Sequence, residues 1–202
     1  MKISYKKKAS GFTLIEMIGV LAVIAILAAL LIPKIFEAIN NARINNAAVT
    51  IGTCKSAVAD HYAKYGSLSS TNGVAVTLPH PGFDIALLQE GFLDKPFSVK
   101  ISSVLTNEVR LVQGLAPAAA IGATDAAYDL DGAGGNDAGP TSAAVVEAVI
   151  YGVNANDAWE LSKRIDGDAL SAADAATADT KGRVKYGTPG ANTEIHVYLT
   201  HR

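Results

Sequence analysis

The sequence has few of the residues from which covalent frameworks and enzyme sites are built. It contains one cysteine in 202 residues, which excludes an internal disulfide and any multi-cysteine zinc site. The four histidines are scattered, and the sequence has no H-E-x-x-H pair, G-x-S-x-G elbow, P-loop or dinucleotide-binding fingerprint. We therefore predict that the protein is not an enzyme.

Charged residues are also scarce. They make up 18% of the sequence, and the formal net charge is -2, so the chain lacks the basic excess of a general nucleic-acid-binding protein. Residues 1–11 hold four of the lysines, and the remainder carries 13 lysines and arginines against 19 aspartates and glutamates, a net charge of -6. Such a surface repels phosphate on average, and nucleic acid is not expected as a partner.

The apolar residues are concentrated near the N-terminus. Residues 1–11, MKISYKKKASG, contain four lysines and no acid, and residues 12–32 carry Glu16 as their only charge. As a helix, the second segment would be about 31 Å long, close to the hydrocarbon thickness of a bilayer, with its basic end held in the cytoplasm. An ordinary secretory signal is cut after its apolar region, whereas this run continues into a helical pattern without a turn. The pattern predicts a retained membrane helix.

Glu16 is the unusual residue of this segment. A carboxylate within a membrane span costs on the order of 2–3 kcal/mol or more, so Glu16 is either functional or close enough to the membrane edge to reach the headgroups. Cleavage after Gly11 would place a new α-amino group on Phe12, four residues before Glu16. The carboxylate could then form an ion pair with an amine, within one subunit or between two.

The residues around this point, SGFTLIEM, resemble the processing motif of type IV pilins and pseudopilins, and the short basic leader resembles that of the type IVa group. The resemblance implies that a prepilin peptidase cuts after Gly11 and methylates Phe12. It also implies that Glu16 pairs with the N-terminal amine of a neighbouring subunit. Pro33 stands where the family has a proline at the end of the apolar half of its helix. The sequence departs from the family at Ala25, where many members have a glycine at which the helix can unwind.

The resemblance implies a homo-oligomeric helical filament as the functional form. The precursor would lie in the inner membrane, where it meets the prepilin peptidase and an assembly platform, and would later form an extracellular filament for adhesion or motility. Two alternatives stay open: a pseudopilin of a type II secretion-like system, or a membrane-anchored binding domain. Major pseudopilins usually carry a D-P-W-G-like segment, whereas residues 93–97 here read LDKPF and the only tryptophan is Trp159.

After Pro33 the helical pattern becomes one-sided. An apolar stripe with spacings of three and four residues predicts an amphipathic helix that ends at Gly66. Cys54 is expected to be a small core residue of this stripe. The stripe comprises Ile44, Ala48, Ile51, Cys54, Val58, Tyr62 and Tyr65. Because proline lacks an N–H and its ring meets the carbonyl of Ala29, a kink is expected at Pro33.

The rest of the chain predicts a head with an antiparallel sheet. Strands are expected within 97–112, with a turn at 106–108, and at 144–153, 182–187 and 193–202, with short helices around 83–92 and 157–164. The expected fold class is α+β, a long N-terminal α-helix packed against a C-terminal antiparallel β-sheet. The expected parts are a basic leader (1–11), a membrane or filament-core helix (12–33), an amphipathic helix (34–66) and a globular head (67–202).

An acidic segment offers a candidate cation site. Asp129, Asp131, Gly134 and Asp137 match positions one, three, six and nine of an EF-hand loop, whereas Ala133 replaces the ligand at five and Pro140 the glutamate at twelve. Calcium is therefore a candidate ligand, and it would order a loop that has no disulfide. The alternative is a solvated turn, because aspartate and glycine are also the residues that turns favour. No other cofactor is expected.

Overall fold

The computed structural model describes residues 11–71, 74–77, 80–104, 107–114, 125–135, 137–139 and 143–202. The basic leader up to Ser10 lies outside the described residues, as do Asn136 and Pro140 of the acidic segment. The chain divides between Asn41 and Ala42 into two compact units. We call the second of these, from Ala42 to Arg202, the head.

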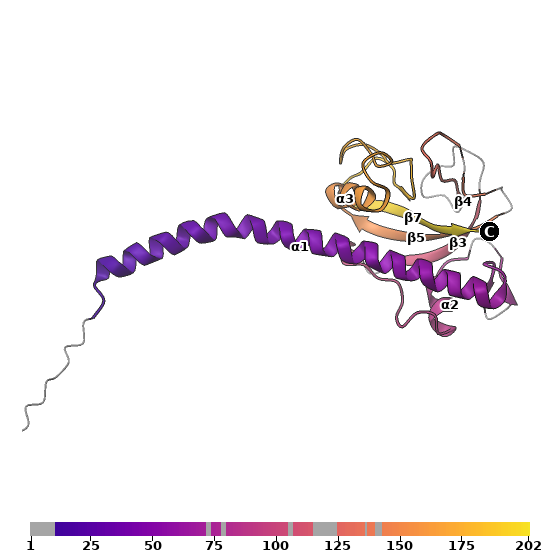
Figure 1. Ribbon diagram of the computed structural model, residues 1–202, viewed down its shortest axis with the longest axis horizontal. Helices are drawn as coiled ribbons and strands as arrows, with labels where there is room; N and C mark the ends of the chain where they lie inside the picture. The colour runs from indigo at the N-terminus through magenta and orange to yellow at the C-terminus, as the bar shows by residue number, and fades with distance from the viewer. Residues whose placement is uncertain are drawn as a thin grey trace, which may run out of the picture. The chain divides into compact units, whose positions relative to one another are not determined.

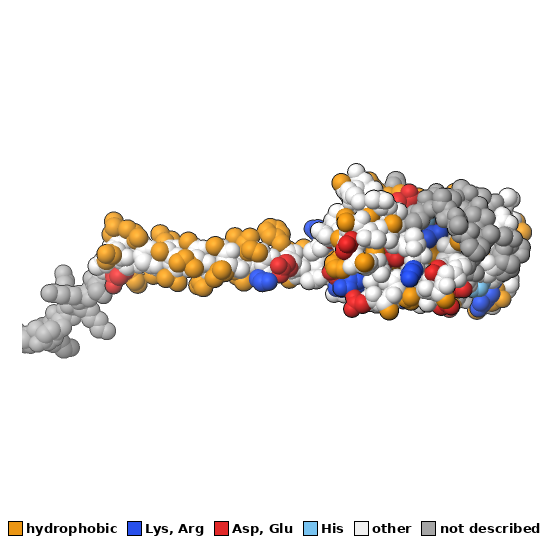
Figure 2. Space-filling model, turned by 90° about the horizontal axis from the view of Figure 1, so that it is seen from above, with side chains coloured by type: hydrophobic (Ala, Val, Ile, Leu, Met, Phe, Trp, Pro, Cys, Tyr) orange, Lys and Arg blue, Asp and Glu red, His pale blue; other side chains and the backbone are white. Residues whose placement is uncertain are grey.

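Helix α1 runs from Leu14 to Tyr65, and Pro33 lies inside it. In the first unit its large apolar side chains are exposed, for example those of Leu14 and Leu30, and Figure 2 shows apolar groups along this part of the helix. An 18-residue window of the helix has a mean hydropathy of 2.8, so the helix is long and apolar enough to cross a membrane. The kink at Pro33 stays a prediction.

The head is built on a five-stranded sheet with the order β4-β3-β5-β7-β6, seen beside the later turns of α1 in Figure 1. All neighbouring strands are antiparallel except β3 and β4, which pair in parallel. A two-stranded sheet, β1 with β2, follows α1. The bounds are β1 Ser70–Thr71, β2 Val74–Ala75, α2 Phe83–Gln89, β3 Glu108–Gly114, β4 Asp125–Ala126, β5 Ala144–Val153, α3 Ala155–Asp166, β6 Val184–Lys185 and β7 Thr193–His201. The predicted α+β layout of a long helix and an antiparallel sheet is confirmed.

The helix ends follow the expected capping rules. Gly66, with a φ of 69°, ends α1, and its N–H donates to the carbonyl of Tyr62. Helix α3 begins after its N-cap residue Asn154, whose side-chain oxygen accepts a hydrogen bond from the N–H of Asp157 at 2.9 Å.

The apolar stripe of α1 packs against one face of the sheet and forms the core of the head. Ile44, Ile51 and Val58 from the helix share this core with alternating residues of β5 and β7, such as Ile150 and Val197. Cys54 also lies in the core, and burial raises the pKa of its thiol to about 12, so it is an unreactive core residue, as predicted.

The strand predicted over the first part of 97–112 is wrong. Phe97, Val99 and Ile101 are buried, but the chain there is irregular and a strand begins only at Glu108. In this irregular segment the N–H of Phe97 has a side chain of α2 as its acceptor in place of a neighbouring strand: it donates to the Asp84 carboxylate at 2.9 Å. The alternation of apolar residues thus reflects burial of an irregular segment, which a sequence pattern cannot tell from a strand.

The second face of the sheet carries two buried polar side chains, one from β6 and one from β7. His196 is 1% exposed and Lys185 is 5% exposed. Tyr128 and Ala138, from the segment that follows β4, pack over this face against Val112 and Val145. The sheet is therefore covered on both sides.

Candidate functional site

In the N-terminal turn of α1, Glu16 and Thr13 are joined by hydrogen bonds in both directions. The N–H and the hydroxyl of Thr13 both donate to Oε2 of Glu16 at 2.8 Å, and the N–H of Glu16 donates to Oγ1 of Thr13 at 3.3 Å. This reciprocal arrangement is a capping box, which satisfies two of the free N–H groups at the start of a helix. The T-x-x-E spacing that produces it is visible in the sequence.

The capping box directs the carboxylate toward the residue that cleavage would turn into the N-terminus. Phe12 directly precedes Thr13, and its side chain is 78% exposed. A positive amine on Phe12 would therefore form next to a carboxylate that already faces the start of the helix, where the helix dipole also favours negative charge. Pro33 lies far along the same helix and does not take part in this arrangement.

The acidic segment brings its three predicted carboxylates together. One oxygen from each of Asp129, Asp131 and Asp137 can lie within 4.8 Å of the others, and Asp131 and Asp137 are exposed. Calcium requires six to eight oxygens, so backbone carbonyls and water would have to complete the shell.

Hydrogen bonds within the acidic segment hold this arrangement. Oδ2 of Asp137 accepts the N–H of Leu130 at 2.8 Å, and Oδ1 of Asp129 accepts the N–H of Gly134 at 3.2 Å. Gly134 has a φ of 90°, a conformation that favours glycine and lets the loop turn back. A solvated acidic turn uses the same contacts, so the geometry fits both interpretations that the sequence left open.

A buried charge network that was not predicted from the sequence lies on the second face of the sheet. Glu147 of β5 is 1% exposed, and its Oε1 lies 2.7 Å from Nε of Arg110 and 3.2 Å from Nδ1 of His196. The hydroxyl of Tyr128 donates to the other oxygen of Glu147. The signal in the sequence was Glu147 itself, a single acid within the otherwise apolar strand AVVEAVIYGV. A buried carboxylate requires such partners.

The network keeps Glu147 charged in spite of its burial. Burial alone would raise the pKa of the carboxyl, but the hydrogen bond and charge of His196, the charge of Arg110 and the Tyr128 hydroxyl lower it to about 2. Burial opposes a charged imidazole on His196, yet the hydrogen bonds to Glu147 and Glu194 raise the pKa of His196 above its ordinary value. The pair is therefore a salt bridge at mildly acidic pH.

The same network attaches the acidic segment to the sheet. Tyr128, one residue before Asp129, bonds to Glu147, and Nζ of Lys185 donates to the carbonyl of Ala127 at 3.1 Å. Nζ of Lys185 also lies 4.4 Å from the centre of the Tyr128 ring. In a chain whose single cysteine allows no disulfide, these contacts hold the segment that covers the second face.

The stability of the head is expected to peak between about pH 4.5 and 6.5. The stabilisation from Glu147, whose pKa is lowered, is complete above 4.5 and is lost as the pH falls toward about 2. The stabilisation from His196, whose pKa is raised, is complete below 6.5 and is lost as the pH rises through the folded value. The melting temperature of the full chain in detergent, followed by fluorescence of Trp159 in α3, measures this. A profile that rises steadily from pH 5 to 8 would contradict it.

The comparison with protein families gives one finding. The prokaryotic N-terminal methylation motif matches residues 6–32, which include Gly11, Phe12 and Glu16. No curated protein and no solved structure gives a significant match to the chain.

Proposed function

We propose that this chain, which carries the type IV prepilin-like N-terminal methylation signal, is the structural subunit of a type IV pilus-like surface filament. It is a pilin-like or pseudopilin precursor, and such precursors are membrane-anchored through the apolar helix. The observation that supports the proposal is the place of the signal: it includes the exposed apolar start of α1, and the later turns of the same helix contribute to the core of the folded head.

Processing would convert the precursor into an assembly-competent subunit. A prepilin peptidase hydrolyses the bond between Gly11 and Phe12, which removes four lysines and leaves an amine on Phe12 that is then methylated. Glu16, already directed toward the start of the helix by Thr13, is the carboxylate available to this amine or to that of a neighbouring copy.

Assembly would exchange lipid contacts of the apolar helix for contacts with other copies. Helices in lipid gain little from the hydrophobic effect and associate through close packing and polar contacts. The segment 12–32 supplies small residues for close approach, among them Gly19, Ala25 and Ala29, and one polar contact at Glu16. An ion pair between Glu16 and an amine would fix the register of one helix against the next.

The proposed partners are further copies of this chain, the prepilin peptidase, and an assembly platform in the inner membrane. The role is structural rather than enzymatic. Antibodies against the head, imaged by electron microscopy of whole cells, test the location: labelling along surface filaments is expected. Labelling confined to the membrane would contradict the pilus role and leave the pseudopilin.

Calcium is proposed as a ligand of the acidic segment, and the observation that favours it is the convergence of the Asp129, Asp131 and Asp137 carboxylates. These three charges repel one another, and a divalent cation would offset the repulsion. The bound ion would add to the contacts of Tyr128 in holding this segment over the sheet.

Saturating calcium is expected to raise the melting temperature of the full chain in detergent, and a chelator is expected to reverse the rise. Stabilisation by a ligand reaches about 2.7 kcal/mol at a concentration one hundred times its Kd. The Asp131→Asn variant should lose most of the effect, whereas Asp168→Asn, whose side chain is 85% exposed, should keep it. An unchanged melting temperature at millimolar calcium would rule the site out.

A further inference from the structure

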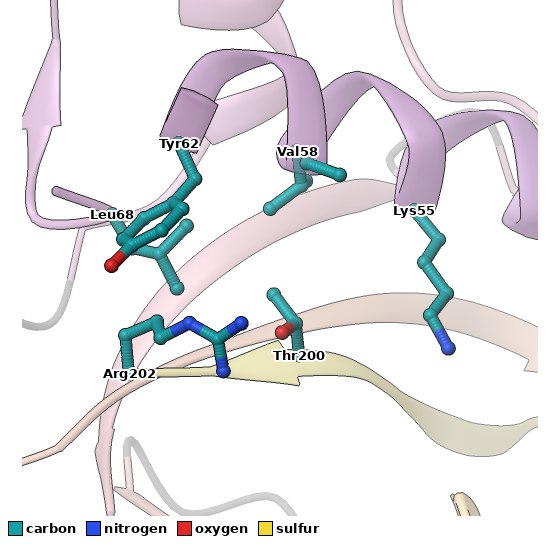
Figure 3. A pocket seen from close by; sticks show the side chains of 7 residues that line it. Lys55, Val58, Tyr62, Leu68, Thr200 and Arg202 are labelled. Carbon is teal, nitrogen blue, oxygen red and sulfur yellow. The ribbon is translucent and has the colours of Figure 1, made fainter. Parts of the chain in front are cut away.

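A small basic pocket lies in the head between helix α1 and the end of strand β7. Val58, Ala59 and Leu68 form its apolar wall, and Lys55 and Arg202 supply two cations. Figure 3 shows Lys55 and Tyr62 reaching from the helix, with the Arg202 guanidinium beneath the Tyr62 ring and beside Thr200.

A shift in strand register creates this pocket. The pairing of β5 with β7 is irregular between Val146 and Glu147, so that Val146 pairs with Thr200 whereas Glu147 pairs with Tyr198. Val146 belongs to the core on the helix side, and Glu147 faces the other side. The shift therefore turns Thr200 toward the helix and interrupts the two-residue alternation of side chains along β7.

The charges in the pocket are available to a ligand. Lys55 is exposed and makes no ion pair within the part of the chain that the structure describes. The guanidinium of Arg202 lies 5.2 Å from the centre of the Tyr62 ring and donates to the carbonyl of His201. The acid nearest to Lys55 along the helix, Asp60, does not line the pocket. Two cations beside a tyrosine and a hydroxyl favour a carboxylate as the occupant.

The volume limits what can enter. The pocket measures about 120 Å³, whereas pockets for small-molecule ligands usually measure roughly 300–1,000 Å³. It has room for about four water molecules or a single acidic side chain. A side chain presented by another protein fits this size better than a free cofactor does.

The head itself carries a matching acidic surface. From Ala42 onward the sequence has 12 lysines and arginines against 17 aspartates and glutamates, a net charge of -5, so identical heads repel one another unless a local basic site meets a local acidic one. The densest exposed acidic group among the described residues is the acidic segment with Asp131 and Asp137. It lies beyond the face of the sheet that Tyr128 covers, on the side opposite to α1.

We propose that the Lys55–Arg202 pocket receives the Asp131 side chain of the acidic segment from the head of a second copy of this chain, and that this contact and calcium compete for the Asp131 carboxylate. Because the two surfaces lie on opposite faces of one head, each copy can give its acidic segment to one neighbour and its pocket to another. Such a contact between unlike surfaces does not close a two-fold dimer and is compatible with a helical filament. The inference rests on the proposed filament and names the contact between heads within it.

Charge reversal in cells that assemble the protein tests this contact. Lys55→Glu and Asp131→Lys are each expected to lower the amount of protein in the sheared filament fraction by about tenfold or more, and the double variant should restore most of it. Lys100→Glu reverses an exposed lysine outside the pocket and should leave the amount unchanged. Single variants that assemble normally, or a double variant that is not restored, would overturn the contact.

Cross-linking tests whether residues 55 and 131 of neighbouring copies lie next to each other, which a general effect of charge on assembly would not reveal. In a Cys54→Ala background, Lys55→Cys combined with Asp131→Cys should yield disulfide-linked ladders from oxidised filaments, and either cysteine alone should not. Filaments of the double-cysteine variant that show no ladders on oxidation would overturn the head contact and leave the proposed filament intact. A wild-type chain that forms no filaments would instead refute the proposed function.

Discussion

Replacing Glu147 by glutamine is expected to lower the free energy of unfolding of the head by about 3–5 kcal/mol, because the change leaves buried charges without their counter-charge. Arg110 and His196 both lie against the Glu147 carboxylate, whose side chain is 1% exposed. The loss would be a large fraction of the 5–15 kcal/mol by which domains are usually stable. Trp159 fluorescence during urea unfolding of the full chain in detergent measures the change.

Two further results identify the network as the cause. The Asp168→Asn variant removes an exposed acid that contacts Lys163, and its free energy of unfolding should stay within about 0.5 kcal/mol of wild type. Glu147→Gln should also reduce the loss of stability that the wild type shows as the pH falls below 4.5, because one carboxyl with a strongly lowered pKa is gone. A Glu147→Gln variant as stable as the wild type would contradict the network's role in attaching Tyr128 and the acidic segment.

Replacing Glu16 is expected to leave cleavage after Gly11 intact and to reduce filament assembly by about tenfold or more, since an ion pair in lipid would be lost. Two substitutions separate the charge from the capping box. Glu16→Ala removes both, whereas Glu16→Gln can still accept the N–H of Thr13 and preserves the helix start. If the charge is what assembly requires, both variants should fail equally.

The measurement is the ratio of processed protein in the sheared filament fraction to that in the membrane. Glu37→Gln is a suitable control, because Glu37 is exposed in the same unit and pairs with Lys34 at 3.0 Å. Normal filaments from Glu16→Gln would show that assembly does not require the charge of Glu16, and failure of Glu16→Ala beside it would assign the role to the capping box.

The features that could be predicted from the sequence are those set by local patterns. The apolar run of 12–32 and the one-sided stripe from Ile44 to Tyr65 follow from helical periodicity, and the β-branched run of 144–153 marks β5. The prepilin-like signal could be predicted for the same reason, because cleavage and methylation depend on a short contiguous segment.

The features that could not be predicted depend on residues that are distant in sequence. The irregular segment at Phe97 is held by Asp84, and the buried network joins Arg110, Glu147 and His196 from three strands. The two-residue alternation of a strand indicates which residues share a face of β7, but it does not indicate that Tyr128 covers the face opposite to α1. Thr200 also escaped prediction, since a register shift can be read only from the paired strands.

The proposed function requires that the chain is cut after Gly11, methylated on Phe12 and exported into a surface filament. The most direct test is the intact mass of the protein recovered from filaments sheared mechanically from cells. The expected mass in that fraction is that of residues 12–202 plus one methyl group. A full-length chain, or processed protein found only in the membrane fraction, would contradict it.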